Sequence, residues 1–237
     1  MSAATVLGFD TATPDVAVAV TRGSEAVTEV QLGSDGRPRH ATELLPAIER
    51  AAAEAGGWDA IDAIAVGLGP GSFTGLRIGI ATARGLAQGL SKPLSGVGTL
   101  DALARGIAER PGASGRLLLA VLDARRGQVF AALRDAAGAA AWEPLVATPE
   151  ELGERVAALG EIPLSGGDGS LRFRQDLEQA GAEVLPDADP AHRLSARHTA
   201  EIAAGLPGSA PGEVRPIYLR PPDAELWIQR DRKPIDS

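Results

Sequence analysis

The amino-acid sequence begins the same structural unit twice, and this repeat limits the folds open to the chain more than any other feature. One apolar run ends in Asp10 and another ends in Asp123, and each leads through a short turn into a second apolar run. When the two aspartates are aligned, Val16 falls on Val129 without a gap. Internal self-similarity of this kind indicates repeated structural units. We therefore expect two lobes of related design.

The hydrophobic pattern predicts three strands, then alternating helices and strands, in the first unit, and a similar start to the second. Apolar runs joined by tight turns favour an antiparallel meander. The later strand–helix alternation favours parallel pairing with right-handed crossovers. The first unit has predicted strands at residues 6–10, 16–21, 26–31, 61–66 and 94–97, and helices at 41–55, 76–90 and 99–110. The second has predicted strands at 117–123, 129–133 and 142–147, and helices at 152–159 and 171–180.

These elements predict an α/β fold with duplicated βββαβαβα units. We expect an N-terminal lobe over residues 1–111 and a C-terminal lobe over residues 112–220, followed by an irregular tail at 221–237. Prolines and glycines dominate from Leu206 onward, and this composition favours irregular structure.

Composition excludes several classes of function. The chain has no cysteine, which removes disulfides and thiolate metal sites. Its formal charge is −8 with only two lysines, whereas a protein that binds RNA alone usually carries a basic patch. No apolar run approaches the roughly 20 residues of a membrane span, and no signal peptide is visible. We therefore expect a cytoplasmic protein without a membrane partner.

A glycine-rich loop at residues 67–77 lies between a predicted strand and a predicted helix. Glycines leave backbone N–H groups open to an anion at a helix N-terminus. The loop lacks the lysine of a Walker A motif and the spacing of a dinucleotide fingerprint. A tight turn and a phosphate contact both stay open as interpretations. The candidate cofactor-binding residues, with the preceding strand end included, are Asp10, Thr11, Gly69, Gly71 and Ser72.

The helix after this loop carries Gly75, Gly79, Ala83 and Ala87, each four residues apart. Such residues share one helix face. This stripe of small residues lets another backbone approach closely, either the chain's own sheet or a helix of a partner. The sequence alone does not separate these alternatives. Our prediction is an interface with another subunit, formed by His40, Leu44, Leu45, Ile48, Gly75, Leu76, Gly79, Ile80, Ala83 and Ala87.

Three polar residues are candidates for catalysis or metal binding. Asp10 and Asp123 either cap turns, which we favour from the residues alone, or act on magnesium near a phosphate. His40 has Leu44, not a second histidine, four residues later, so the metal-binding helical pair is missing. A lone histidine is more often a capping or interface residue. We therefore expect no metal site and no catalytic residues.

Several motifs make the sequence similar to a known family. They are Gly-Phe-Asp-Thr-Ala-Thr at 8–13, His-Ala-Thr-Glu-Leu-Leu-Pro at 40–46, Gly-Leu-Gly-Pro-Gly-Ser-Phe-Thr-Gly-Leu-Arg at 67–77, Asp-Ala-Arg-Arg-Gly at 123–127 and Pro-Ile-Tyr-Leu-Arg at 216–220. The chain resembles the TsaB (YeaZ) family, densely over the first ~135 residues. Gln128 and Phe130 depart mildly from the Glu and Tyr that we expect there.

The resemblance implies an actin, sugar-kinase and Hsp70-like (ribonuclease H-like) fold with two lobes. It implies a non-catalytic subunit that binds the catalytic subunit TsaD through its N-terminal lobe, with the ATPase TsaE as a further partner. The product is N6-threonylcarbamoyladenosine at position 37 of tRNAs that read codons starting with A, and tRNA is reached only through the complex. In isolation we expect a homodimer. No cofactor is tightly bound, and any ATP or ADP with magnesium is expected to bind weakly at the interface.

Two other functions remain to be compared with this one. A small-molecule kinase of the same fold would use Asp10 or Asp123 with magnesium ATP, but the chain is short for the insertions that close over a substrate. A metallopeptidase would need the histidine pair that Leu44 interrupts.

Overall fold

The computed structural model describes residues 3–33 and 38–220, and it contains two five-stranded sheets with the same topology. The strand orders are β3-β2-β1-β4-β5 and β10-β9-β6-β7-β8. When the second sheet is read from its opposite edge, as β8-β7-β6-β9-β10, its strands correspond one by one to those of the first. In each sheet three strands form an antiparallel meander and two add in parallel. The first sheet contains β1 (Thr5–Asp10), β2 (Val16–Arg22), β3 (Glu25–Leu32), β4 (Ala63–Gly67) and β5 (Leu94–Val97). The second contains β6 (Leu118–Arg125), β7 (Gln128–Arg134), β8 (Ala140–Ala147), β9 (Leu164–Gly166) and β10 (Glu183–Val184).

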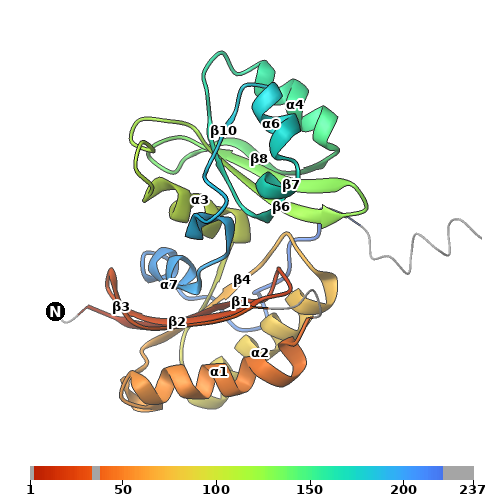
Figure 1. Cartoon of the computed structure of the whole chain (residues 1–237). Coiled ribbons are helices and arrows are strands. Elements are labelled where there is room, and N and C mark those ends of the chain that lie inside the picture. The colour runs from red at the N-terminus through yellow and green to blue at the C-terminus, as the bar shows by residue number, and fades with distance from the viewer. Residues whose placement is uncertain (1–2, 34–37, 221–237) are drawn as a thin grey trace, which may run out of the picture.

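The sheets and helices form alternating layers, as Figure 1 shows. Two helices, α1 (His40–Glu54) and α2 (Phe73–Leu90), cover the outer face of the first sheet. On the outer side of the second sheet lie α4 (Pro149–Ala157) and α6 (Arg174–Gln179). Two further helices, α3 (Thr99–Ala108) and α7 (Ala196–Ala204), lie between the sheets. This arrangement confirms the predicted two-lobed α/β fold with duplicated units.

The two lobes exchange a helix. Helix α3 follows the first sheet in sequence but packs on β6, β7 and β9 of the second. Helix α7 follows the second sheet but packs on β1, β2, β4 and β5 of the first. Each helix is thus anchored in the other lobe, and the two helices also contact each other. The division into residues 1–111 and 112–220 remains a prediction, and the predicted tail at 221–237 lies outside the described residues.

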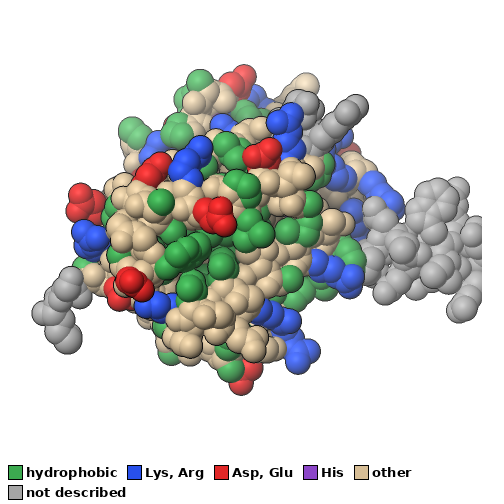
Figure 2. Space-filling model, turned by 90° about the horizontal axis from the view of Figure 1, so that it is seen from below, with side chains coloured by type: hydrophobic (Ala, Val, Ile, Leu, Met, Phe, Trp, Pro, Cys, Tyr) green, Lys and Arg blue, Asp and Glu red, His purple; other side chains and the backbone are tan. Residues whose placement is uncertain are grey.

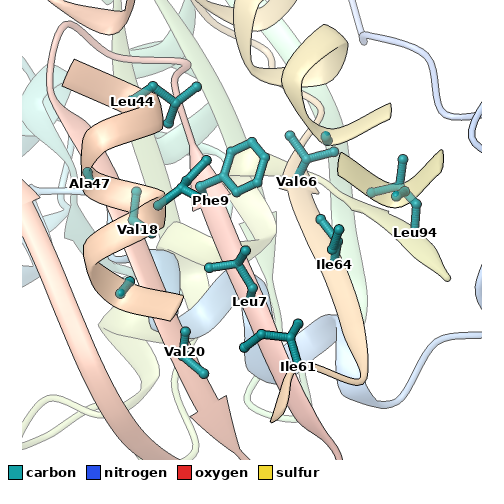
Figure 3. Packing of buried hydrophobic residues seen from close by; sticks show 14 of the residues in the cluster. Leu7, Phe9, Val18, Val20, Leu44, Ala47, Ile61, Ile64, Val66 and Leu94 are labelled. Atoms are coloured by element: carbon teal, nitrogen blue, oxygen red, sulfur yellow. The ribbon is translucent and has the colours of Figure 1, made fainter. Parts of the chain in front are cut away.

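The core of the first lobe explains why α1 and α2 lie where they do. Leu7 and Phe9 of β1 point from the same side of the strand into one cluster with Val18, Ile64 and Leu44 (Figure 3). All five side chains are almost completely buried. Because alternate residues of a strand face opposite sides, the neighbouring Val6 packs instead in the cluster that contains α7. Strand β1 is therefore buried on both faces.

Local signals set the helix ends, with two departures from prediction. Thr148 forms a capping box with Glu151 at the start of α4, as a threonine N-cap should. Ser72 accepts a hydrogen bond from the backbone of Gly75, so α2 begins at Phe73, three residues earlier than predicted. The predicted helix at 171–180 is two short helices, α5 (Asp168–Arg172) and α6, separated at Phe173.

Candidate functional site

A cleft of about 400 Å³ opens between the two lobes. One wall comes from the turn after β1 and from the start of α2. The other wall comes from the β6–β7 hairpin, with Asp123 and Arg125, and from Asp168. The segment Ile217–Arg220 closes one side. The volume lies within the range of about 300–1,000 Å³ that small ligands occupy, so this cleft is the candidate site.

Asp10 lies at the end of β1, but it does not line the cleft. Its side chain is buried, and both carboxylate oxygens already accept hydrogen bonds. Oδ1 accepts from the backbone N–H of Ala12 at 2.7 Å, and Oδ2 accepts from the hydroxyl of Thr99 at 2.8 Å. Burial raises the pKa of Asp10, although these hydrogen bonds lower it in part. The interpretation of Asp10 as a turn-capping acid fits this geometry.

The glycine-rich loop wraps tightly around Asp10. A Cβ at Gly67 would lie 2.0 Å from Oδ2 of Asp10, so any larger residue would displace the carboxylate. The backbone N–H of Gly69 donates to the hydroxyl of Thr99 at 3.1 Å, and the N–H of Thr99 donates back to the carbonyl of Gly69. Two backbone hydrogen-bonding groups of Gly69 are therefore used inside the protein. The loop fixes the strand-to-helix turn.

Of the five predicted cofactor-binding residues, three are buried inside the protein and two line the cleft. Asp10, Thr11 and Gly69 are buried, and the hydroxyl of Thr11 donates to the carbonyl of Gly75 at 2.8 Å. Only Gly71 and Ser72 line the cleft. Ser72 uses its hydroxyl to cap α2. Binding of a phosphate by this loop remains a prediction, and it rests on Gly71 and Ser72 alone.

Asp123 lies at the equivalent place in the second lobe and does line the cleft. Its Oδ1 accepts from the backbone N–H of Arg125 at 2.8 Å, in the same two-residue turn that Asp10 makes. Its Oδ2 lies 2.7 Å from Nη1 of Arg172 and 3.6 Å from Nη1 of Arg125. Asp168 accepts from the backbone N–H of Asp123 at 2.9 Å. Burial, together with the charge of Asp123, raises the pKa of Asp168.

These residues do not fit a magnesium nucleotide of the kind that the fold allows. Magnesium prefers oxygen ligands such as ionised carboxylates. Asp10 is enclosed by its own loop, and Asp123 is paired with arginines. No group of three or more His, Asp or Glu side chains that could hold a metal occurs in residues 3–33 and 38–220. The two carboxylates that a kinase of this fold would use are therefore held in contacts within the protein.

His40 has a structural position. The side chain is buried, and its Nε2 lies 2.8 Å from the carbonyl oxygen of Thr13 and 3.2 Å from that of Asp15. Because carbonyl oxygens only accept, Nε2 carries the proton and donates. His40 thus joins the start of α1 to the β1–β2 turn. It presents no surface to a partner.

The stripe of small residues on α2 is not a surface, and this corrects the predicted interface. A Cβ at Gly75 would lie 2.1 Å from the carbonyl oxygen of Thr11, and one at Gly79 would lie 2.3 Å from the hydroxyl of Thr11. The stripe therefore packs on the turn after β1 and on the sheet. Of the predicted interface residues, those buried inside the lobe are His40, Leu44, Ile48, Gly75, Leu76, Gly79, Ile80, Ala83 and Ala87. Only Leu45 is exposed, at 52%.

The face of α1 and α2 that points away from the sheet is exposed to solvent. Leu45 on α1 and Ala81 on α2 are exposed, and Ile78 and Leu86 on α2 are half-buried. Figure 2 views the molecule from this side and shows apolar side chains gathered near its centre. The sequence already indicated an exposed apolar face, because the segment Leu76–Leu90 has apolar residues on more than one side of the helix. The spacing of these residues does not show which side the sheet covers.

Sequence analysis also missed three residues that shape the site. Thr99 was predicted only as the start of a helix, and Asp168 lay in a segment for which no helix or strand was predicted. Arg172 had no signal at all, because an arginine on a short helix is ordinary. Their partners lie 45 to 89 residues away in the chain, which no local pattern can reveal.

Solved structures place this fold in the actin-like class that includes sugar kinases. A ROK hexokinase from Thermus thermophilus aligns with a TM-score of 0.51 at 16% identity, over 84% of this chain and 98% of its own, which shows the fold alone. YeaZ from Pseudomonas aeruginosa aligns with a TM-score of 0.73 at 29% identity, over 91% of this chain and 100% of its own.

Sequence comparison gives the family. The tRNA threonylcarbamoyladenosine biosynthesis protein TsaB of Escherichia coli is 34% identical over 91% of this chain and 94% of its own length. The family model "TsaD: tRNA N6-adenosine threonylcarbamoyltransferase" matches residues 35–154. The chain therefore belongs to the TsaB family and, through those residues, to the wider family that the TsaD model describes. The expected resemblance is confirmed. Among the described residues, no helix has the length and apolar character needed to cross a membrane.

Proposed function

We propose that this chain is a non-catalytic subunit of the assembly that forms N6-threonylcarbamoyladenosine at position 37 of tRNAs reading codons that start with A. Its role is to bind and activate a TsaD-like catalytic subunit, with a TsaE-like ATPase as a further member. The chain contacts tRNA only through the complex. The protein works in the cytoplasm. When it is purified without its partners, it forms a homodimer.

The contacts of the candidate catalytic residues support the non-catalytic role. Asp10 is enclosed, and His40 donates to two backbone carbonyls. Leu44 stands four residues after His40, where a metal-binding helix would carry a second histidine, and its side chain packs in the core. Asp123 is paired with Arg172. The groups that a kinase or a metallopeptidase would use are thus committed to the fold.

The proposal of a protein partner rests on the outer face of α1 and α2. An apolar surface rimmed by polar residues marks a protein–protein contact. Leu45 on α1 is 52% exposed, and Ala81 on α2 is exposed as well. Small and aliphatic side chains allow a second helix pair to pack closely and to gain many van der Waals contacts. The homodimer uses the same face, since a self-complementary apolar patch closes with two-fold symmetry.

A charge placed on this face tests the proposal. Ala81→Arg should fold normally, because Ala81 is exposed, yet it should abolish both the homodimer and the complex with the same organism's TsaD. Ala157→Arg, on the exposed side of α4 in the other lobe, is the matched control and should leave both assemblies intact. Light scattering after size exclusion measures the assemblies. A complex that survives Ala81→Arg would overturn this face as the interface.

Reconstitution tests the role itself. The chain, TsaD, TsaE, the threonylcarbamoyl-adenylate synthase, tRNA, threonine, bicarbonate and ATP should yield the modified base. Omission of TsaD should abolish the product even at high concentrations of this chain. Modified base formed without TsaD would refute the non-catalytic role.

A further inference from the structure

A second cavity, of about 700 Å³, lies between the lobes, and none of the described residues that line it also lines the cleft. Helix α3, which Figure 1 shows between the two sheets, contributes Asp101, Ala104, Arg105 and Ala108. Their spacing places these four residues on one helix face. Leu118 lines the cavity at the start of β6, whereas the cleft is lined by the end of that strand. The two spaces are therefore separate, and one lies near each end of β6.

Most of the residues that line the cavity are apolar or glycine. Val97 comes from β5, Leu118 from β6 and Ile202 from α7, and α3 and the β7–β8 turn contribute alanines. Leu206, just after α7, also lines the cavity and is 45% exposed. Apolar surface that is left open in a concave site is covered favourably by an apolar group of a ligand. A ligand of this cavity should therefore have an aliphatic or aromatic part.

Four charged side chains also line the cavity, and their formal charges cancel: Asp101, Glu201, Arg105 and Arg134. Arg134 and Asp101 form a fixed pair, because Nη2 and Nε of Arg134 lie 2.6 and 2.7 Å from Oδ1 of Asp101. The Arg134 side chain is 7% exposed, and its Nη1 donates to two backbone carbonyl oxygens. Arg134 is therefore held by the protein and is not available to a ligand.

The other acid, Glu201, is only half satisfied. Its side chain is 8% exposed, and its Oε1 accepts from Nη1 of Arg197 at 2.7 Å. Its Oε2 is buried and accepts no hydrogen bond from residues 3–33 and 38–220. Nε of Arg105 lies 3.6 Å from this oxygen, which is beyond hydrogen-bonding distance. A buried carboxylate oxygen without a hydrogen bond is costly, so Oε2 of Glu201 is the acceptor that a ligand would satisfy.

Arg105 is the group that a ligand can draw away from Glu201. Its side chain is 52% exposed, and within the described part of the chain its guanidinium group makes one ionic contact, with Glu201. Exposed side chains change rotamer within nanoseconds, so Arg105 can turn toward an anion. Its departure would leave the buried carboxylate of Glu201 less compensated, which is unfavourable. A ligand that takes Arg105 must therefore supply a cation to Glu201 at the same time.

We propose that this cavity binds a free α-amino acid with an apolar side chain, inserted between Arg105 and Glu201. The ligand's ammonium group donates to Oε2 of Glu201, and its carboxylate accepts from the guanidinium group of Arg105. The apolar side chain packs against the alanines and aliphatic residues of the lining. A zwitterion adds no net charge to a cavity whose own charges cancel. This inference goes beyond the proposed role as a partner subunit and does not depend on it.

Calorimetric titration of the full chain tests the proposal. The probes are L-valine, L-leucine and L-phenylalanine, and the controls are isoamylamine and isocaproate, which are leucine without its carboxylate and without its ammonium group. We expect saturable binding of at least one amino acid. Each control should bind at least about tenfold more weakly than leucine, because it lacks one charge-assisted hydrogen bond. No binding of any of the three amino acids up to about 10 mM, or a control that binds as tightly as leucine, would overturn the proposal.

Two matched variants locate the site. Glu201 and Glu109 both accept hydrogen bonds from Arg197, but only Glu201 lines the cavity. Glu201→Gln should weaken amino-acid binding about tenfold, because the ammonium group loses a charged acceptor. Glu109→Gln disturbs the same arginine and should change the affinity by less than about twofold. Equal losses in the two variants would show that only the ion pairs of Arg197 matter and would overturn the assignment.

A third variant tests the role of Arg105, and its exposed position means that folding should not depend on it. In Arg105→Gln, leucine should lose its advantage over isoamylamine, because no guanidinium group remains for the carboxylate. Isoamylamine should bind at least as tightly as it does to the wild type, since no cation competes with it at Glu201. Thermal unfolding checks the fold, and this variant decides the question if Glu201→Gln does not fold. An unchanged preference for leucine in folded Arg105→Gln would contradict the proposal.

Discussion

The hydroxyl of Thr99 donates a 2.8 Å hydrogen bond to the buried carboxylate of Asp10, and this contact joins the two lobes. Asp10 ends β1 in the first sheet, while Thr99 begins α3, which packs on the second sheet. The same hydroxyl accepts from the backbone of Gly69. One side chain therefore connects a strand, the glycine-rich loop and the helix that crosses between the lobes.

Thr99→Val should destabilise the protein by about 1–3 kcal/mol, because it leaves a buried carboxylate oxygen and a backbone N–H without a partner. Thr99→Ser keeps the hydroxyl and loses only one buried methyl group, which costs about 1 kcal/mol. Urea unfolding of the two variants measures the difference. If the serine variant were as unstable as the valine variant, packing and not hydrogen bonding would explain the role of Thr99.

Gly79→Ala should destabilise the protein by about 1–3 kcal/mol or more, since its Cβ would lie 2.3 Å from the hydroxyl of Thr11. Gly85→Ala, on the same helix, meets nothing within 4 Å. It should stabilise the protein by about 0.5–1 kcal/mol, because alanine favours a helix more than glycine does. Opposite shifts of the melting temperature are expected, and shifts of the same sign would contradict the packing of α2 described here.

Ala83→Arg should prevent folding, because Ala83 has no exposed surface and an arginine there would be an unpaired buried charge. Circular dichroism and solubility measure the outcome. Ala81→Arg serves as the reference for a charge on the exposed side of the same helix. Soluble, cooperatively folding Ala83→Arg protein would show that the stripe faces outward after all.

Replacing Asp10 by Asn should change how stability depends on pH. Burial raises the pKa of Asp10 above its ordinary value of 3.8, so folding favours the protonated acid. Its stabilising contribution is present below pH 3.8 and is lost as the pH rises through the raised, folded-state pKa. The free energy of unfolding of the wild type, relative to Asp10→Asn, should therefore fall from acidic pH toward neutral pH. Parallel stability curves for the two proteins would contradict a raised pKa.

Much of the fold could be predicted because its signals are local. Apolar runs of the right length define strands such as β1 and β6, and an aspartate at or near the end of each accepts a backbone hydrogen bond in the following turn. The repeat of these units predicts two similar sheets. Each of these inferences needs only residues that lie close together in the chain.

The faces and partners could not be predicted in the same way. Helix α2 is apolar on two sides, so its sequence fits a stripe that faces the sheet and one that faces a partner equally well. Arg172 lies 49 residues from Asp123 and Thr99 lies 89 residues from Asp10, so sequence spacing contains no sign of these pairs.

The sequence by itself determined the strands of the first sheet and the three-strand meander of the second, most helices and the family resemblance, because periodicity and turn chemistry act over a few residues. The short strands β9 and β10 and the helix α7 were not predicted. Only the tertiary structure decided that α3 and α7 cross between the lobes, that Gly75 and Gly79 are closed against Thr11, and that Asp123 is covered by arginines. The physical reason is that burial and ion pairing depend on distances between segments, and the packing of the two sheets sets those distances.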